Sequence, residues 1–443
     1  MSSKVKSPSA TADVSAFVPK LRFPEFIGHA VQKLQLADVT TESTERNGAG
    51  HVPSQVMGVS KVEGIVPMEA RIISADTTRY KFVRKDWFAY NPMRINIGSI
   101  ARWQGDSDIL VSPDYVVFRC KGAGPNRLDP SYLDHFRRSA AWEEFVSEKG
   151  DGSVRVRIYY KDLARLQLAL PSFPEQQKIA DCIDSSDVLI EAQGRKVEVL
   201  KAHKKGLTQR LFPRPERIEN GVKIPADTIP RLRFPEFRTA GDWGRGELGP
   251  KTDKVGSGIT PNGGDRNYRS SGRPFVRSQN VGWGELLLDD VACLDEETHN
   301  SFASTEIRLG DVLLNITGAS IGRSAVADRR IVGGNVNQHV CIIRVKQKEI
   351  DQFYLNQYLI SQYGQKQIDN FQAGGNRQGL NFAQIRTFSI PLPPKMPEQH
   401  RIAECLTSLD DLINAENQKL DNLKSHKKGL MQQLFSSFAE ADA

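Results

Sequence analysis

The sequence lacks the motifs of most enzymes and metal proteins. None of its 443 residues belongs to a phosphate-binding GxxxxGK[ST] loop, and the five cysteines form neither a CxxC pair nor a ligand cluster. No apolar run is long enough to cross a membrane. The first 18 residues are rich in Ser, Ala and Lys and have no apolar core, unlike a signal peptide. These absences predict a reduced, cytoplasmic protein with no metal and no catalytic residues.

One segment has a partial likeness to a catalytic motif. Tyr90-Asn91-Pro92-Met93 is similar to the Asn-Pro-Pro-aromatic box of amino-methyltransferases. It lacks the second proline and the aromatic residue, and no glycine-rich cofactor loop follows a strand nearby. The segment therefore does not predict an active site.

Length and charge give only coarse expectations. At 443 residues the chain is too long for one ordinary domain, and its composition is that of a globular protein. The net charge of +7 indicates, weakly, a polyanionic partner.

The most informative feature is a helical stretch that occurs twice. The copies run from Pro174 to Phe212 and from Pro397 to Phe435, and they align without gaps with roughly half of the positions identical. A shorter segment, Leu-Arg-Phe-Pro-Glu-Phe, also occurs twice, at residues 21–26 and 232–237. Such a match indicates an internal duplication. It divides the chain into a lead-in (1–18), a first domain (19–173), a first spacer helix (174–212), a linker (213–229), a second domain (230–396), a second spacer helix (397–436) and a tail (437–443).

Apolar residues recur along each copy at spacings of three, four or seven, which is typical of a coiled coil. In the first copy the predicted pairing residues are Ile179, Ile183, Ile190, Val197, Leu200 and Leu207. In the second copy they are Ile402, Leu406, Leu409, Ile413, Leu420, Leu423 and Leu430. Acids gather in the first half of each copy and bases in its last turns, so an antiparallel pair sets opposite charges against each other. The alternative is two independent amphipathic helices, each packed on its own domain.

The regions between these repeats mix short β-like runs with loops, and helices are predicted from Ser131 to Ser147 and from Gln352 to Asn370. The middles of the two regions show no convincing match. The predicted fold class is α/β (α+β): two globular mixed α/β domains joined by two long antiparallel coiled-coil helices, with a pseudo-two-fold internal repeat.

Several loops are rich in Arg, Asn, Gln, Ser and Gly, which suits contact with DNA. Arg and Lys match guanine edges, Asn and Gln match adenine edges, and glycines let backbone amides approach phosphates. The alternative for each loop is an ordinary surface turn. The candidates in the first region are Lys81, Arg84, Lys85, Arg94, Asn96, Ser99, Arg155 and Arg157. In the second region they are Asn262, Arg277, Ser278, Asn280, Thr317, Ser320, Arg323, Asn376, Arg377, Gln378 and Asn381.

Through its repeated motifs, the sequence resembles the specificity subunits of type I restriction–modification enzymes. The resemblance covers nearly the whole chain after the lead-in. It depends on PEQQKIADCI and PEQHRIAECL before the long helices and on HKKGLTQRLF and HKKGLMQQLF at their ends. The stretches from Gly310 to Arg323 and from Tyr90 to Ser99 are similar to motifs of target-recognition domains in that family.

The resemblance implies a DNA-binding subunit without catalysis of its own. Each variable region would be a target-recognition domain that reads one half of a split, asymmetric site in double-stranded DNA. The paired helices would set the spacer between the half-sites. Two modification (methyltransferase) subunits would dock on the paired helices and on the domains, and restriction subunits would complete the endonuclease. The cofactors S-adenosylmethionine, ATP and Mg would belong to those partners, and none to this chain.

Three alternatives stay open at this point. The chain could be a methyltransferase or nuclease with its own active site, which the missing motifs disfavour. It could instead be a coiled-coil adaptor whose domains bind proteins, against which salt-dependent DNA binding would count. It could also serve a related enzyme in which cutting and methylation are fused, and only the partner's sequence would distinguish that case.

Overall fold

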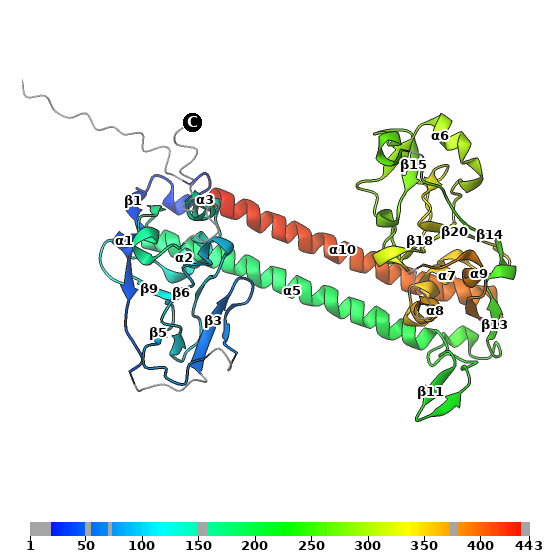
Figure 1. Ribbon diagram of the computed structural model, residues 1–443, viewed down its shortest axis with the longest axis horizontal. Helices are drawn as coiled ribbons and strands as arrows, with labels where there is room; N and C mark the ends of the chain where they lie inside the picture. The colour runs from blue at the N-terminus through cyan, green and yellow to red at the C-terminus, as the bar shows by residue number, and fades with distance from the viewer. Residues whose placement is uncertain are drawn as a thin grey trace, which may run out of the picture. The chain divides into compact units, whose positions relative to one another are not determined.

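The computed structural model describes residues 19–48, 55–69, 73–148, 157–261, 263–372 and 379–435. The chain divides into two compact units: unit 1 holds Met1–Ala192 and Lys419–Ala443, and unit 2 holds Gln193–Gln418. Two continuous helices, α5 (Phe173–Leu211) and α10 (Met396–Leu434), each contribute one part to either unit (Figure 1). No helix among the described residues is long and apolar enough to cross a lipid bilayer.

Unit 1 contains two four-stranded sheets and one strand pair. The first sheet is antiparallel, in the order β2 (Thr40–Ser43), β9 (Val116–Cys120), β6 (Phe88–Tyr90), β7 (Ile100–Arg102). The second sheet has the order β4 (Gly64–Pro67), β3 (Val56–Ser60), β8 (Ile109–Val111), β5 (Lys81–Val83), with β3 and β8 parallel. The remaining elements are the pair β1 (Gln32–Gln35) and β10 (Gln167–Leu170), and the helices α1 (Leu36–Val39), α2 (Pro130–Phe136), α3 (Ala140–Glu148) and α4 (Tyr160–Leu163).

Unit 2 repeats this plan. Its antiparallel sheet has the order β14 (Thr252–Ser257), β20 (Val340–Val345), β17 (Val312–Asn315), β18 (Ser324–Val326). The second sheet has the order β16 (Ala292–Leu294), β15 (Arg273–Val276), β19 (Asn335–Val336), with β15 and β19 parallel. The remaining elements are the pair β13 (Gly244–Glu247) and β21 (Ser389–Leu392), and the helices α6 (Glu296–Ser301), α7 (Gln352–Leu359), α8 (Gln362–Gln372) and α9 (Phe382–Arg386). The predicted fold class is confirmed.

The two predicted domain helices are each broken in two. Ser139 lies between α2 and α3, where its hydroxyl accepts from the Trp142 amide at 3.5 Å. Ser361 lies between α7 and α8, where its hydroxyl accepts from the amides of Tyr363 and Gly364, both at 3.2 Å. A serine that satisfies the free amides of a first turn starts a new helix, which explains the break.

The residues predicted as a linker (213–229) include a β-hairpin in unit 2, formed by β11 (Arg217–Glu219) and β12 (Val222–Ile224). It projects from the rest of that unit (Figure 1). Its turn is Asn220-Gly221, and both residues have positive φ (51° and 78°), as a tight two-residue hairpin turn requires. Asp227 attaches the hairpin by accepting from Arg214 at 2.7 Å and Arg217 at 3.2 Å.

The long helices pair antiparallel in both units. In unit 2, Lys204 Nζ lies 2.5 Å from Asp410 Oδ1 and Lys196 Nζ lies 2.5 Å from Glu416 Oε1. The later residue of α5 thus pairs with the earlier residue of α10, so the two helices run in opposite directions. In unit 1, Lys427 Nζ lies 2.5 Å from Asp187 Oδ1. Lys204–Asp410 and Lys427–Asp187 are the same pair of repeat positions with the helices exchanged. This is the charge complementarity that the sequence predicted.

The predicted pairing residues are all buried or half-buried. Those nearest each helix start also join a domain core: Ile179 and Ile183 in unit 1, Ile402 and Leu406 in unit 2. The end of the other helix enters the same core. Phe435 packs against Tyr132 and Phe136 in unit 1, at ring-centroid distances of 5.2 and 5.7 Å. In unit 2 the equivalent Phe212 packs against Tyr354 and Tyr358, at 5.4 and 5.3 Å.

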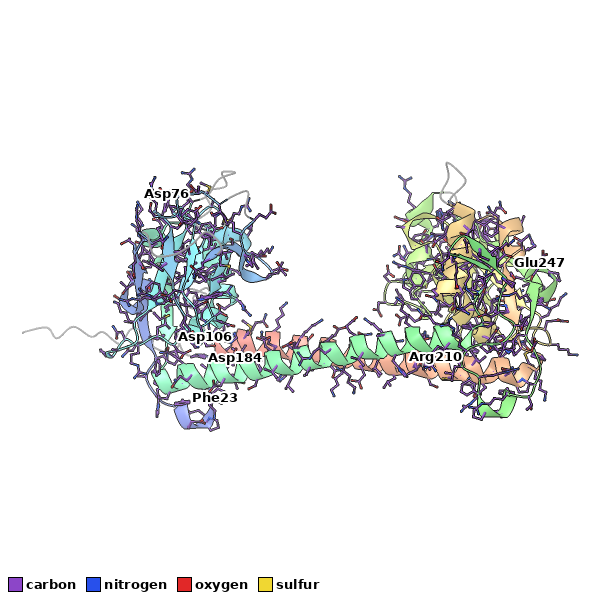
Figure 2. All side chains as sticks on the ribbon, turned by 90° about the horizontal axis from the view of Figure 1, so that it is seen from below. Phe23, Asp76, Asp106, Asp184, Arg210 and Glu247 are labelled. Atoms are coloured by element: carbon purple, nitrogen blue, oxygen red, sulfur yellow. The ribbon has the colours of Figure 1, made fainter. Side chains whose placement is uncertain are left out.

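The repeated Leu-Arg-Phe-Pro-Glu-Phe segment serves as a helix anchor. Arg22 donates to both carboxylate oxygens of Glu175, at 2.8 and 2.5 Å, and Arg233 donates to both oxygens of Glu398, at 2.7 and 2.8 Å. Phe23, beside Arg22, is labelled in Figure 2. The following glutamine accepts from the N-cap amide of a domain helix: Gln176 from Asp129 at 2.9 Å, and Gln399 from Asp351 at 3.0 Å. The Pro-Glu-Gln motif therefore fixes each domain to the start of its own long helix.

Candidate nucleic-acid interface

One loop occupies the same place in the first sheet of each unit. In unit 1 it joins β6 to β7, and the Asn91 amide donates to the Ser99 carbonyl at 3.1 Å. In unit 2 it joins β17 to β18, and the Asn315 amide donates to the Arg323 carbonyl at 2.8 Å. Each loop closes on a glycine in the left-handed region, Gly98 (φ 93°) or Gly322 (φ 85°). These are the two stretches that the sequence singled out as target-recognition motifs.

The β6–β7 loop presents polar and apolar side chains to solvent. Arg94 and Asn96 are exposed, and so are the neighbouring Met93 and Ile97. The Ile158 amide donates to the Pro92 carbonyl at 3.0 Å, which places the exposed Arg157 on the segment beside this loop. The side chains of Arg94, Asn96 and Arg157 form no hydrogen bond or ion pair with any residue that the structure describes. Three predicted contact residues on two neighbouring segments are thus exposed and have unused donors.

Other predicted residues of unit 1 are already engaged within the protein. The Ser99 hydroxyl donates to the Val59 carbonyl at 2.9 Å, and Lys81 Nζ donates to the Tyr115 carbonyl at 2.6 Å. Burial lowers the pKa of the Lys81 ammonium below its ordinary value. Arg84 pairs with Glu45 at 2.6 Å and covers the Trp87 ring. Lys85 remains on the surface, paired with Asp106 at 2.6 Å (Asp106 is labelled in Figure 2). Arg155 lies outside the described residues.

In unit 2 several predicted segments converge at one end of the first sheet. Thr317 bridges to Gly379, and the Thr317 hydroxyl lies 2.6 Å from His339 Nδ1. Asn315 Nδ2 donates to the Ser278 carbonyl at 2.7 Å, which brings the β15 end to the same place. The Gly258 amide donates to the Asn337 carbonyl at 3.3 Å, and a Cβ on Gly258 would lie 1.6 Å from the Val336 carbonyl oxygen. Only glycine permits this approach.

The predicted residues of unit 2 divide between structural and available groups. Asn280 is buried and donates to the Leu287 carbonyl at 2.9 Å, Asn381 caps α9, and Arg277 donates to the Asp290 carbonyl at 2.7 Å. Thr317, Ser320 and Arg323 are half-buried on the β17–β18 loop, and Ser278 is half-buried after β15. Four further predictions, Asn262, Asn376, Arg377 and Gln378, lie outside the described residues.

The β17–β18 loop also has the spacing of a hydrolase nucleophile motif, because Gly318-Ala319-Ser320-Ile321-Gly322 reads GxSxG. That motif needs a sharp turn from a strand into a helix. Here Ser320 lies in a loop between two antiparallel strands. The local structure therefore does not support a nucleophilic serine.

Two exposed or polar positions were missed by the sequence analysis. Lys61 follows β3, and its Cγ lies 3.4 Å from where a Cβ on Gly98 would be, so its chain reaches the β6–β7 loop. His339 contacts Thr317 on the other loop. Two features of the sequence could have pointed to these residues. Lys61 lies in a Ser-Lys-Val-Glu-Gly turn between two apolar runs, and His339 ends the mostly polar run from Asn335.

One group of possible metal ligands occurs among the described residues: His135, Asp184 and Asp187, whose ligand atoms lie within 4.8 Å of one another. Figure 2 labels Asp184 on α5. Each of the three side chains has a partner within the protein, although His135 Nδ1 is buried without a hydrogen-bond partner among the described residues. His135 Nε2 lies 2.8 Å from Asp184, the Ser131 hydroxyl donates to Asp184 at 3.0 Å, and Lys427 pairs with Asp187. We interpret the group as a polar network of unit 1 in which His135 is buried and Asp184 is exposed.

Comparison with known proteins gives a consistent result. Residues 296–425 match the family described as the type I restriction modification DNA specificity domain. The chain is 24% identical over 372 residues to the putative type I restriction enzyme MjaX specificity subunit of Methanocaldococcus jannaschii, covering 82% of this chain and 80% of that protein. It is also 24% identical over 323 residues to the type I restriction enzyme MjaVIII specificity subunit of the same organism, covering 70% of each.

Two solved structures share the fold. The S subunit of a type I restriction–modification system from M. genitalium is 14% identical and has a TM-score of 0.57, with 94% of this chain and 99% of that chain covered. A chain from a structural study of assembly and conformational transition of the type I R-M system is 18% identical. Its TM-score is 0.52, with 91% of this chain and 97% of that chain covered.

Proposed function

We infer what this chain does from the family to which it belongs, the DNA specificity subunits of type I restriction–modification systems. It is the sequence-reading subunit of such a system and is not itself an enzyme. It acts in a complex with DNA, modification subunits and restriction subunits. The proposals below concern how this particular chain performs that role.

The two domains each read one half of a split DNA site. The observation that carries this proposal is the repetition of one sheet order in both units, with different residues on the equivalent loops. The β6–β7 loop offers Arg94 and Asn96, whereas the β17–β18 loop offers Ser320 and Arg323. Different donors and acceptors match different base edges. The recognised site is therefore asymmetric.

The long helices set the distance between the half-sites. Each helix has 39 residues, which at ~1.5 Å per residue is roughly 60 Å of continuous helix. Buried Arg–Glu pairs and the Phe212 and Phe435 contacts attach both ends of the helix pair to domains. Helices that run without a break from one unit into the other support this proposal.

Two modification subunits dock on this chain, one for each half-site, and methylate adenine there. They supply S-adenosylmethionine, and the restriction subunits supply the site for ATP and Mg. This chain holds none of these cofactors. Because it binds DNA, we place it in the cytoplasm.

Exchange of the first recognition region tests the proposal. Residues 27–173 are replaced by the same region of a relative with a different methylation motif, and the modified adenines are mapped in cells that express the modification subunit. We expect one half-site to change while the other half-site and the spacer stay. Replacing the linker residues 213–229 by those of the relative is the control and leaves the motif unchanged. A change in both half-sites after the domain exchange would contradict the division of reading between domains.

A further inference from the structure

The β6–β7 loop and the β17–β18 loop correspond residue by residue. In unit 1 residues 91–99 lie between a paired residue of β6 and one of β7, and in unit 2 residues 315–323 lie likewise between β17 and β18. Each stretch has its left-handed glycine, Gly98 or Gly322, in the eighth position. Side chains at the same position of the two loops can therefore be compared directly.

At two of these positions the β6–β7 loop exposes a large apolar side chain and the β17–β18 loop does not. Met93 is 49% exposed, whereas Thr317 at the same position has its hydroxyl 2.6 Å from His339 Nδ1. Ile97 is 51% exposed, whereas the corresponding Ile321 is half-buried and packs against the core of unit 2. Because the same scaffold replaces or buries these groups in unit 2, their exposure is a property of the β6–β7 loop alone.

The backbone of the β6–β7 loop is held in place by contacts within unit 1. Ile95, between the two exposed apolar residues, is buried in the core of that unit. The Met93 amide donates to Asn91 Oδ1 at 3.0 Å, and the Ser99 hydroxyl donates to a carbonyl of β3 at 2.9 Å. The loop therefore presents Met93 and Ile97 in a fixed arrangement, which lowers the entropy cost of binding.

The major groove of DNA offers one kind of apolar group to such side chains. Phosphates and the other base edges are polar, whereas thymine carries a 5-methyl group that projects into the major groove. The exposed Asn96, next to Ile97, matches N6 and N7 of adenine in the same groove. Since adenine pairs with thymine, Asn96 and an adjacent apolar side chain suit the two halves of one A·T pair.

We propose that Met93 and Ile97 read thymine through its 5-methyl group, so that the half-site of unit 1 contains at least one thymine recognised in this way. The proposal rests on the function proposed above, because it requires unit 1 to bind a half-site in DNA. Cytosine has no methyl group at this position and cannot form the contact. Burial of one methyl group corresponds to a change in Kd of about fourfold.

A wedge between base pairs is the other use that DNA-binding proteins make of exposed Met and Ile side chains, mainly from the minor groove. The neighbours Arg94 and Asn96 favour the major groove, because guanine O6 and N7 and adenine N6 and N7 are presented there. The two modes differ in what they require of the DNA. Methyl reading depends on the thymine methyl group, whereas a wedge does not.

Replacement of thymine by uracil tests the proposal, because uracil lacks only the methyl group. The motif is first obtained by methylation mapping, and the exchange of residues 27–173 shows which half-site belongs to unit 1. Each thymine of that half-site is then replaced in turn in a synthetic duplex, and Kd is measured for the complex of the full chain with its modification subunit. We expect at least one replacement to raise the Kd of the wild type about fourfold.

Met93→Ala and Ile97→Ala assign the effect to these residues. Each variant should bind the thymine duplex more weakly than the wild type, and the double variant should bind the thymine and uracil duplexes equally. Ile27→Ala is the matched control, because Ile27 is 69% exposed in unit 1 and lies outside the loop. It should keep the wild-type difference between the duplexes. Since all three side chains are exposed, the thermal unfolding midpoints should stay at the wild-type value.

Three results would overturn the proposal and leave the proposed function intact. They are a half-site of unit 1 without thymine, a wild-type complex that binds thymine and uracil duplexes equally, and a double variant that keeps the wild-type difference. An equal loss of affinity for both duplexes in the double variant would identify a wedge. A methylation map with no motif that depends on this chain would instead overturn the proposed function itself, and this proposal with it.

Discussion

At the scale of single residues, two buried arginines attach the domains to the long helices. The Arg233 side chain is 7% exposed and the Glu398 side chain is fully buried, and two hydrogen bonds join them. The Trp243 indole also donates to Glu398, at 3.3 Å. The value of such a pair lies mainly in the cost of separating it, because a buried carboxylate without its cation is strongly destabilising.

Arg233→Met should therefore destabilise unit 2. It leaves the Glu398 carboxylate buried without its guanidinium, which costs about 3–5 kcal/mol of unfolding free energy. Urea denaturation of the full chain measures the effect. Lys85→Met, which removes an exposed pair with Asp106, is the control and should leave the midpoint unchanged. Equal midpoints for the two variants would show that the buried pair does not hold the helix.

A second residue-scale prediction concerns pH. Burial lowers the pKa of His135 below its ordinary value of 6.5, and Asp184 opposes this shift only in part. Below pH 6.5 the unfolded chain binds the proton more readily than the folded chain does. The stability that His135 contributes is therefore complete above pH 6.5 and is lost as the pH falls below it.

His135→Gln introduces the residue that unit 2 has at the equivalent position, Gln357, and removes this titration. The wild-type thermal midpoint should fall more than the variant midpoint when the pH is lowered from about 7.5 to about 5.5. Gln357→His is the reciprocal variant, and its thermal midpoint should become more sensitive to low pH than that of the wild type. Parallel curves for wild type and His135→Gln would contradict the assignment.

At the scale of elements, the end of each long helix belongs to the core of the domain that the other repeat begins. Phe435 is the last residue of the second repeat, yet its ring packs on α2 of unit 1. Phe212 ends the first repeat and packs on α7 of unit 2. Each unit is therefore completed by residues from both repeats.

Phe435→Ala and Phe212→Ala should affect opposite units. A buried Phe→Ala change costs about 3–5 kcal/mol. In hydrogen exchange by mass spectrometry, Phe435→Ala should lower protection of α2, and Phe212→Ala should lower protection of α7. Phe353→Ala, at an exposed position of α7, is the control. If each substitution instead lowered protection in the repeat that carries it, the end of each long helix would not belong to the domain that the other repeat begins.

The elements also show which parts of the fold could be predicted from sequence. The helix pair was predictable, because heptad spacing and charge polarity act within and between two regular helices. The shared sheet order was not, because most of its strands have three to six residues and pair with distant segments. Ser139 and Ser361 each offered a helix-start signal inside the predicted helices, and that signal was missed.

The candidate site was predictable only in part for a related reason. Composition pointed to loops at strand ends that include the exposed Arg94, Asn96 and Arg157, and their contact with DNA stays a prediction. It could not show that Asn280 and Asn381 hold the backbone or that Lys81 donates to Tyr115. Those partners are set by tertiary contacts that sequence spacing does not reveal.

At the scale of the whole molecule, we propose that the domains read the DNA sequence and the long helices set the spacer. Insertion of four residues, about one helical turn, into both α5 and α10 should lengthen the spacer in the methylated motif without changing its half-sites. The insertions belong near residue 193 of α5 and residue 418 of α10, where the two units meet along the chain. Methylation mapping measures both features. A motif with altered half-site bases and an unaltered spacer would contradict the assignment of spacing to the helices.

The central claim is that this chain determines which DNA sequence its partners modify. The most direct test is a genome-wide map of methyl-adenine in cells that express the modification subunit with this chain and in cells that lack this chain. We expect one split, asymmetric motif that is methylated only when the chain is present. Identical maps, from cells in which the complex is shown to assemble, would contradict it.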